Sequence, residues 1–190
     1  FEDENNFNLA RFEDRSRPFL KIQDGCDNYC SYCIIPYTRG KPRSVPLKTI
    51  LCRLEKLAES GYKEVVLTGI SQGKWNQSEP EKLSFAGLIK AIDEAAFLPR
   101  IRISSIEPPD LTDELIEVVA ASKCICPHLH VALQSGCNSV LARMNRRYTT
   151  EFYRERLEAS RSVIKDLYWG ADVIVGFPQE SDEEFESTFN

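Results

Sequence analysis

The chain has 190 residues, of which 42% are hydrophobic and 28% charged, as in a globular protein large enough to form one core. Its formal net charge of −5 argues against a domain that grips nucleic acid unaided, and none of its apolar runs is as long as a membrane span. The seven cysteines, with no signal-peptide character in residues 1–5, predict a cytoplasmic protein whose thiols stay reduced.

The predicted elements alternate between strands and helices. Residues 1–17 are acidic and rich in asparagine, which predicts a linker or a disordered lead-in to one domain over residues 18–190. Apolar runs predict strands at 19–22, 64–68, 101–105, 128–133 and 169–175. Apolar residues at helical spacing predict helices at 46–60, 83–96, 111–121, 138–144, 150–165 and 181–190. Three of these helices have candidate caps, namely Asp110 or Thr112, Thr149 or Thr150, and a capping box of Ser181 with Glu184.

Strands that alternate with helices are typical of βαβ units, so we predict an α/β fold with a parallel sheet. The residues with chemical character follow the predicted strands directly, in the segments 26–33, 68–69, 104–107, 134–136 and 176–178. In parallel α/β barrels the active site is built from the loops at the carboxyl ends of the strands. We therefore expect these five segments to face one mouth, which is the predicted active site.

Three cysteines, Cys26, Cys30 and Cys33, share one short loop with the spacing Cys-x3-Cys-x2-Cys. Three thiolates this close together can hold three corners of a cubane iron–sulfur cluster and leave the fourth iron open to a substrate or cofactor. A structural zinc site is an alternative, but it takes four ligands and the loop contains no histidine. A disulfide framework is a further alternative, although three cysteines within eight residues suit a metal better than pairing.

Tyr32, immediately before the last cysteine, completes a Cys-x3-Cys-x-aromatic-Cys pattern that resembles the motif of radical S-adenosylmethionine (SAM) enzymes. Further segments are similar to signatures of the radical SAM methylthiotransferases, at 23–26, 33–40, 67–70, 128–136, 143–149 and 172–178. The segment 102–108 is most similar to the members that methylthiolate N6-threonylcarbamoyladenosine in tRNA. Sister enzymes that act on isopentenyladenosine in tRNA or on a ribosomal-protein aspartate remain the alternatives.

The resemblance implies a partial parallel (β/α) barrel with five of about six βα units present. It implies a 4Fe–4S cluster on Cys26, Cys30 and Cys33, with SAM bound at its open iron. The residues that it places against SAM are Tyr32, Ser105, Glu107, Gln134, Ser135, Ile174 and Gly176.

The resemblance also implies partners and parts beyond these residues. We expect tRNA as the substrate, an external electron donor and no membrane. A second 4Fe–4S cluster is expected only in an amino-terminal domain that this chain lacks, as it lacks a carboxyl-terminal RNA-binding domain. The chain is thus expected to be a radical SAM core truncated at its carboxyl end, which cannot complete the methylthiolation alone.

Several features leave alternatives open. A non-catalytic module stabilised by zinc is the rival of another class, and a zinc site on Cys124, Cys126, His128 and His130 is conceivable. Cys52 and Cys137 are expected to be buried as small apolar residues. Two basic groups are either local positive patches or solvated surface charge, namely Arg39 with Lys41 and Arg43, and Arg143 with Arg146 and Arg147. The loop at 71–76 departs from the family pattern because a second glycine is absent.

Overall fold

The computed structural model describes residues 16–76 and 83–190. Residues 1–15, most of the predicted linker, lie outside the described residues. In the part of the chain that is described, no helix is long and apolar enough to span a membrane.

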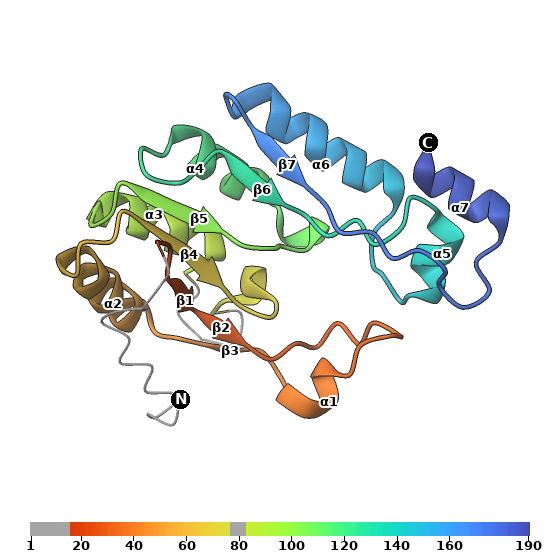
Figure 1. Cartoon of the computed structure of the whole chain (residues 1–190), viewed down its shortest axis with the longest axis horizontal. Coiled ribbons are helices and arrows are strands. Elements are labelled where there is room, and N and C mark those ends of the chain that lie inside the picture. The colour runs from red at the N-terminus through yellow and green to blue at the C-terminus, as the bar shows by residue number, and fades with distance from the viewer. Residues whose placement is uncertain (1–15, 77–82) are drawn as a thin grey trace.

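Five parallel strands form the centre of the fold and lie in the order of the chain (Figure 1). Three of them form one sheet and two form another, and single parallel bridges join Ile101 to Ile125 and Ile106 to Val131 between the two. The strands are β1 (Phe19–Lys21), β4 (Glu64–Thr68), β5 (Arg100–Ile103), β6 (His128–His130) and β7 (Tyr168–Gly170). The predicted α/β fold with a parallel sheet is therefore confirmed, as a partial barrel that does not close over the described residues.

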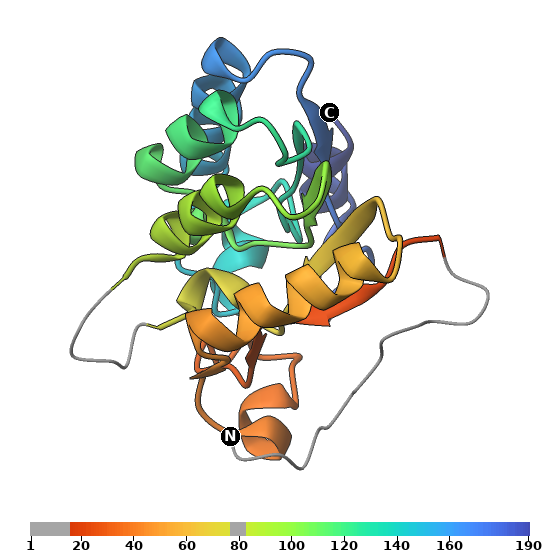
Figure 2. The same ribbon diagram turned by 90° about the vertical axis from the view of Figure 1, so that its left-hand side faces the viewer.

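Helices connect successive strands and pack against one another in chain order. Figure 2 shows α3, α4 and α6 together on one side of the strands. Their bounds lie within three residues of the predicted ones, because each buries one apolar stripe against the sheet. The long helices are α2 (Leu47–Glu59), α3 (Phe85–Ala95), α4 (Asp113–Ala121) and α6 (Thr150–Val163), and the shorter ones are α5 (Asn138–Arg143) and α7 (Asp182–Phe189).

The helix caps follow the predicted pattern. The side chains of Thr112 and Thr149, rather than their alternatives, accept hydrogen bonds from backbone N–H groups of the first turns of α4 and α6. Ser181 and Glu184 form both hydrogen bonds of a capping box at α7. These caps fix where each helix begins relative to the strand before it.

The strands are shorter than predicted at the functional end. The predicted strand at 101–105 ends at Ile103, and the one at 128–133 ends at His130. Beyond those points the backbone turns into loops, as at Gln134, which has a left-handed φ of 65°. The prediction also missed a small excursion after β1, made of β2 (Gln23–Asp24), α1 (Ile35–Arg39) and β3 (Arg43–Ser44).

The loops after the strands meet as predicted. Gln72, in the 3-10 turn η1 (Gln72–Lys74) after β4, donates to Ser104 Oγ and to the Ser105 carbonyl after β5. The backbone of Gln134, after β6, pairs with Asp172 and Ile174 after β7. These contacts join the loops in two pairs, and the hydrogen bond between Ser105 after β5 and His130 at the end of β6 links the pairs at the carboxyl ends of the strands.

The first prediction tests the burial of strand β4. Val65 in β4 is fully buried, whereas Val163 at the end of α6 is 52% exposed. Val65→Ala should lower the free energy of unfolding by about 2 kcal/mol, because it removes buried apolar surface and leaves a cavity. Val163→Ala is the matched control and should stay within about 0.5 kcal/mol of the parent in urea denaturation. Equal losses from the two substitutions would contradict the assignment of β4 to the core.

Candidate functional site

The cysteine loop is an excursion that the short pair β2–β3 closes at its base. Gly25 has φ of 78°, and a Cβ at that position would lie 2.2 Å from the Lys41 carbonyl oxygen. The Cys26 N–H donates to the Gly40 carbonyl at 3.0 Å across the same gap. Only glycine allows this approach, so the sequence Gly25-Cys26 places the first thiol directly at the neck of the loop.

The three thiols are free and partly exposed. Cys26 Sγ accepts from the backbone N–H of Asn28 at 3.4 Å, and burial raises the pKa of the Cys26 thiol. Within the described residues, no three His, Cys, Asp or Glu side chains are close enough to hold one metal ion. A structural zinc site takes four ligands, whereas the loop offers three thiolates and no histidine. Three thiolates suit a cubane cluster, in which each binds a separate iron and the fourth iron stays open.

A segment after β6 holds the cysteine loop from outside. The Met144 carbonyl accepts from the Ser31 N–H at 3.1 Å, and the Arg143 carbonyl accepts from Ser31 Oγ at 2.8 Å. Asn145 Nδ2 donates to the Tyr29 carbonyl at 2.8 Å. Tyr29 is held there at a left-handed φ of 51°, which non-glycine residues adopt only when their surroundings impose it. These contacts hold the cysteine loop in its shape.

Arg146 is the residue that sequence reasoning missed. Its side chain is only 4% exposed, although the sequence grouped it with two arginines as a surface patch. Its Nη1 donates to Cys30 Sγ at 3.1 Å, and its Nη2 forms an ion pair with the Glu107 carboxylate. Arg146 also lies over the ring of Tyr148, whose hydroxyl donates to the Ala132 and Leu133 carbonyls. Two of the three arginines of the second basic group are therefore paired with carboxylates, since Arg143 is likewise paired, with Glu184, whereas Arg147 is exposed.

Of the residues predicted to contact SAM, two lie beside the thiols. Tyr32 is partly exposed, and burial raises its pKa to about 12. Its ring meets that of Phe177 edge to face at 6.2 Å, which joins the cysteine loop to the loop after β7. Glu107 follows β5 and reaches Cys30 through Arg146. Burial raises the pKa of Glu107, and the Arg146 guanidinium counteracts that rise.

The other predicted contact residues lie in the neighbouring loops. Ser105 Oγ hydrogen-bonds His130 Nδ1 at 3.0 Å, and His130 Nε2 lies 3.3 Å from Asp172. Ser135 is fully buried and its Oγ is engaged by Thr188 and the Cys137 N–H. The backbones of Gln134 and Ile174 pair with each other. Gly176 has a left-handed φ of 74°, and its N–H donates to the Glu180 carboxylate. The roles of these residues toward SAM stay predictions.

The remaining cysteines and histidines form no second site among the residues that are described. His128 stacks on Tyr168, and Leu129, the residue between the two histidines, is fully buried. The prediction that Cys52 and Cys137 are buried is wrong. Cys52 lies outside the apolar stripe of α2 and is exposed, and Cys137 is half-buried before α5, where its Sγ contacts Ser139.

The loop after β4 keeps a defined shape without the second glycine. Trp75 is buried and its Nε1 donates to the Val45 carbonyl at 2.9 Å. Lys74 then reaches the cysteine loop, with Nζ paired to Asp27 and 2.6 Å from Asn28 Oδ1. This loop and the segment at 143–146 therefore hold the cysteine loop from two sides.

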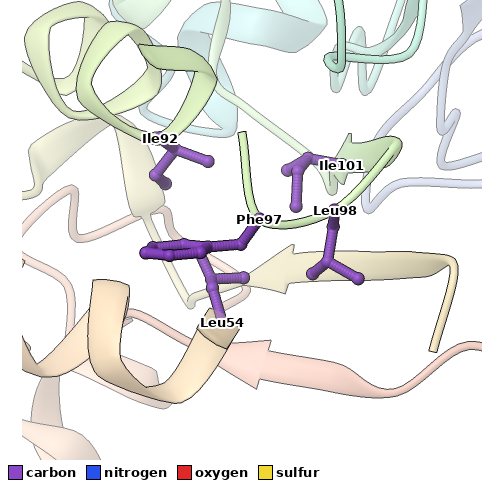
Figure 3. Close-up of a pocket in the computed structure, with 5 residues that line it drawn as sticks. All are labelled: Leu54, Ile92, Phe97, Leu98 and Ile101. Carbon is purple, nitrogen blue, oxygen red and sulfur yellow. The ribbon is translucent and has the colours of Figure 1, made fainter. Parts of the chain in front are cut away.

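An apolar recess lies far from these groups, between α2, α3 and the first residues of β5 (Figure 3). It is too small to hold a water molecule, and no polar side chain lines it. Its lining consists of Leu54, Ile92, Phe97, Leu98 and Ile101. It belongs to the helix–sheet packing rather than to the site.

Comparison with known proteins gives one family. A family model described as the Radical SAM superfamily matches residues 20–190. The threonylcarbamoyladenosine tRNA methylthiotransferases MtaB of Bacillus subtilis and Chlamydia pneumoniae are 46% and 44% identical, over 96% of this chain and 40% and 42% of theirs. The tRNA-2-methylthio-N(6)-dimethylallyladenosine synthase of Thermodesulfovibrio yellowstonii is 42% identical, over 100% of this chain and 44% of its own. The chain spans about two fifths of the length of these curated relatives.

Solved structures share the fold at low sequence identity. The radical SAM methyltransferase TsrM from Kitasatospora setae, with cobalamin and a [4Fe-4S] cluster bound, has a TM-score of 0.73 at 17% identity. That match covers 90% of this chain and 33% of TsrM. Methylornithine synthase (PylB) has a TM-score of 0.59 at 16% identity, over 90% of this chain and 48% of its own. At such identities the likeness shows the fold alone.

The second prediction concerns Asp110 and the dependence of the protein's stability on pH. Asp110 lies in the 3-10 turn η2 (Pro108–Asp110), and its Oδ2 is buried without a hydrogen-bond partner. Burial raises its pKa to about 6, and the charge of Glu107 adds to that rise. Because the folded-state pKa exceeds the unfolded one, ionisation destabilises the fold as the pH rises from about 4 to 6.

Asp110→Asn should therefore match the parent in stability below about pH 4 and exceed it by about 2 kcal/mol at pH 7. Urea denaturation across this pH range measures the difference. Asp166→Asn, at an exposed carboxylate outside the site, is the control and should show no such divergence. A difference for Asp110→Asn that does not change with pH would contradict the burial of an ionising carboxylate there.

Proposed function

This chain belongs to the Radical SAM superfamily, and on that premise we propose that it is the radical-generating part of an enzyme that modifies tRNA. The proposed reaction adds a methylthio group to C2 of N6-threonylcarbamoyladenosine next to the anticodon. We place it in the cytoplasm, with an external electron donor. The single observation that carries the proposal is the cysteine loop, which follows β1 and β2 and carries three free, partly exposed thiols.

Cys26, Cys30 and Cys33 are the proposed ligands of a [4Fe-4S] cluster. When bound, such a cluster with an open iron, together with SAM, supplies a 5′-deoxyadenosyl radical. A radical suits this substrate because the C2–H of adenine is not acidic enough for any side-chain base of ordinary pKa. The protein therefore has to bind and orient the cofactors and to keep water away from the reacting atoms.

Glu107 and Arg146 are the proposed binding groups for the amino-acid end of SAM. That end carries an ammonium and a carboxylate, and the two side chains offer one negative and one positive charge beside Cys30. Their mutual ion pair is mostly removed from solvent. When Glu107 pairs with the ammonium of SAM and Arg146 with its carboxylate, each of the four charges still has an opposite charge beside it. Tyr32 with Phe177 offers an aromatic edge for the adenine of SAM, and Ile174 and Gly176, in the loop that also carries Phe177, are the proposed backbone neighbours of the adenine.

The substrate assignment rests on two observations that agree. Both MtaB relatives are named for threonylcarbamoyladenosine, and the segment 102–108 resembles that group. The second candidate is methylthiolation of dimethylallyladenosine, because a relative with that name is 42% identical over the whole chain. Both candidates share the site and the tRNA partner and differ only in the group on N6.

Mass spectrometry of tRNA nucleosides tests the proposal. A strain that lacks the full-length protein should lose 2-methylthio-N6-threonylcarbamoyladenosine and accumulate its precursor without the methylthio group. The parent gene and Cys52→Ala should restore the product, whereas Cys33→Ala should not. Cys52 is the matched control because its thiol is exposed on α2, away from the loop. Loss of the dimethylallyl product instead would assign the second candidate, and unchanged tRNA would reject the proposal.

A further inference from the structure

The excursion between β2 and β3 carries exposed aromatic and apolar side chains. Tyr37 is 74% exposed, Ile34 64% and Tyr29 47%, and the rings of Tyr29 and Tyr37 meet edge to face at 5.9 Å. Figure 1 shows α1, which carries Tyr37, standing away from the layer of strands. Exposed apolar side chains that gather in one place mark a surface that binds something.

The part of the same excursion that follows Asp27 is basic in an acidic chain. No Asp or Glu occurs between Asp27 and the end of β3 at Ser44, whereas this stretch contains Arg39, Lys41 and Arg43. The net charge of the whole chain is −5, so the positive charge is local. An anionic partner would be attracted to this part of the surface, although the chain as a whole is negatively charged and would repel it.

One buried carboxylate organises these cations. The Asp24 side chain is only 5% exposed and lies 2.8 Å from Lys21 Nζ, 3.7 Å from Arg39 and 3.9 Å from Arg43. Burial acts to raise the Asp24 pKa, but the Lys21 hydrogen bond and the nearby cations lower it overall, so the group stays ionised. Asp24 thus holds three cationic side chains near one another, and these four side chains together carry a net positive charge.

We infer that these residues form a binding surface for single-stranded RNA. We call Tyr29, Ile34, Tyr37, Arg39 and Lys41 the loop patch. Unpaired bases stack on aromatic rings, and lysine and arginine pair with the phosphates between them, which is the combination that the loop patch offers. The inference rests on the proposed function and names its RNA contact as the unpaired loop of the tRNA anticodon arm.

The position of the loop patch supports this partner. Tyr29 lies between Cys26 and Cys30, so the patch begins at the rim of the site itself. An RNA loop that stacks on Tyr29 and Tyr37 is held where one of its bases can enter the site. The hydrogen bond from Asn145 to the Tyr29 carbonyl holds the Tyr29 backbone in its left-handed conformation. This fixes the position from which the Tyr29 side chain extends.

The experiment measures RNA binding by the full-length protein through fluorescence anisotropy. The probes are a labelled RNA hairpin with the stem and loop of the anticodon arm and a duplex of the stem alone. Tyr37→Leu should weaken hairpin binding about tenfold, because it removes one stacking surface but keeps an apolar side chain. It should leave duplex binding unchanged. Lys41→Glu should weaken both and reduce the dependence of affinity on salt by about one phosphate contact.

Two matched controls share residue type and exposure with these positions. Tyr168, like Tyr37, is 74% exposed, but lies on β7, and Lys63 is exposed before β4. Tyr168→Leu and Lys63→Glu should bind the hairpin within twofold of the parent. Thermal unfolding of all four variants establishes that each is folded.

Three results would overturn the inference. If Tyr37→Leu bound the hairpin as tightly as the parent, the RNA bases would not stack on the loop patch. Parent-like RNA binding combined with slower reduction of the cluster by an acidic electron-transfer protein would make the patch a protein docking surface. Parent-like methylthiolation of tRNA by both patch variants would also reject it while the proposed function stands. Failure of the proposed function looks different, since the parent itself would then neither bind the hairpin nor modify tRNA.

Discussion

The close approach of Gly25 to the backbone of Gly40 and Lys41 is the constraint on which the functional end of this chain depends. A side chain at position 25 would lie 2.2 Å from the Lys41 carbonyl oxygen, so the two ends of the excursion meet only because glycine stands there. From that neck the chain makes a closed excursion that carries three partly exposed thiols and several exposed aromatic rings. Chemistry and the proposed RNA contact are thus positioned by one backbone contact.

Charge is the second requirement of the same loop. Three thiolates concentrate negative charge, which is costly in a partly buried place unless cations are near. Arg146 supplies one, through its contact with Cys30, and Lys74 supplies another at Asp27, close enough to lower the pKa of the Cys26 thiol against the effect of burial. Because these cations come from the loops after β6 and β4, the cysteine loop is complete only when the whole sheet has formed. The fold and the site are therefore one cooperative unit.

The sequence predicted the parts of this structure that local periodicity determines. Apolar spacing gave the five strands and six helices, and cap chemistry gave Thr112, Thr149 and the box at Ser181. What it could not predict depends on contacts between distant residues. Arg146 and Glu107 are 39 positions apart, and nothing near Arg146 in the sequence distinguishes it from an exposed arginine. The two-residue strands β2 and β3 have no period to detect. The exposure of Cys52, by contrast, was predictable, because Cys52 lies outside the apolar stripe of α2.

The central claim is that the three thiols hold a cluster with one iron open to SAM. The most direct test is anaerobic reconstitution of the protein with iron and sulfide, followed by electron paramagnetic resonance of the reduced sample with and without SAM. The account predicts a reduced-cluster signal that shifts when SAM is added and that is lost in Cys30→Ala but kept in Cys52→Ala. A folded sample that binds zinc and no cluster, or a cluster signal indifferent to SAM, would contradict it.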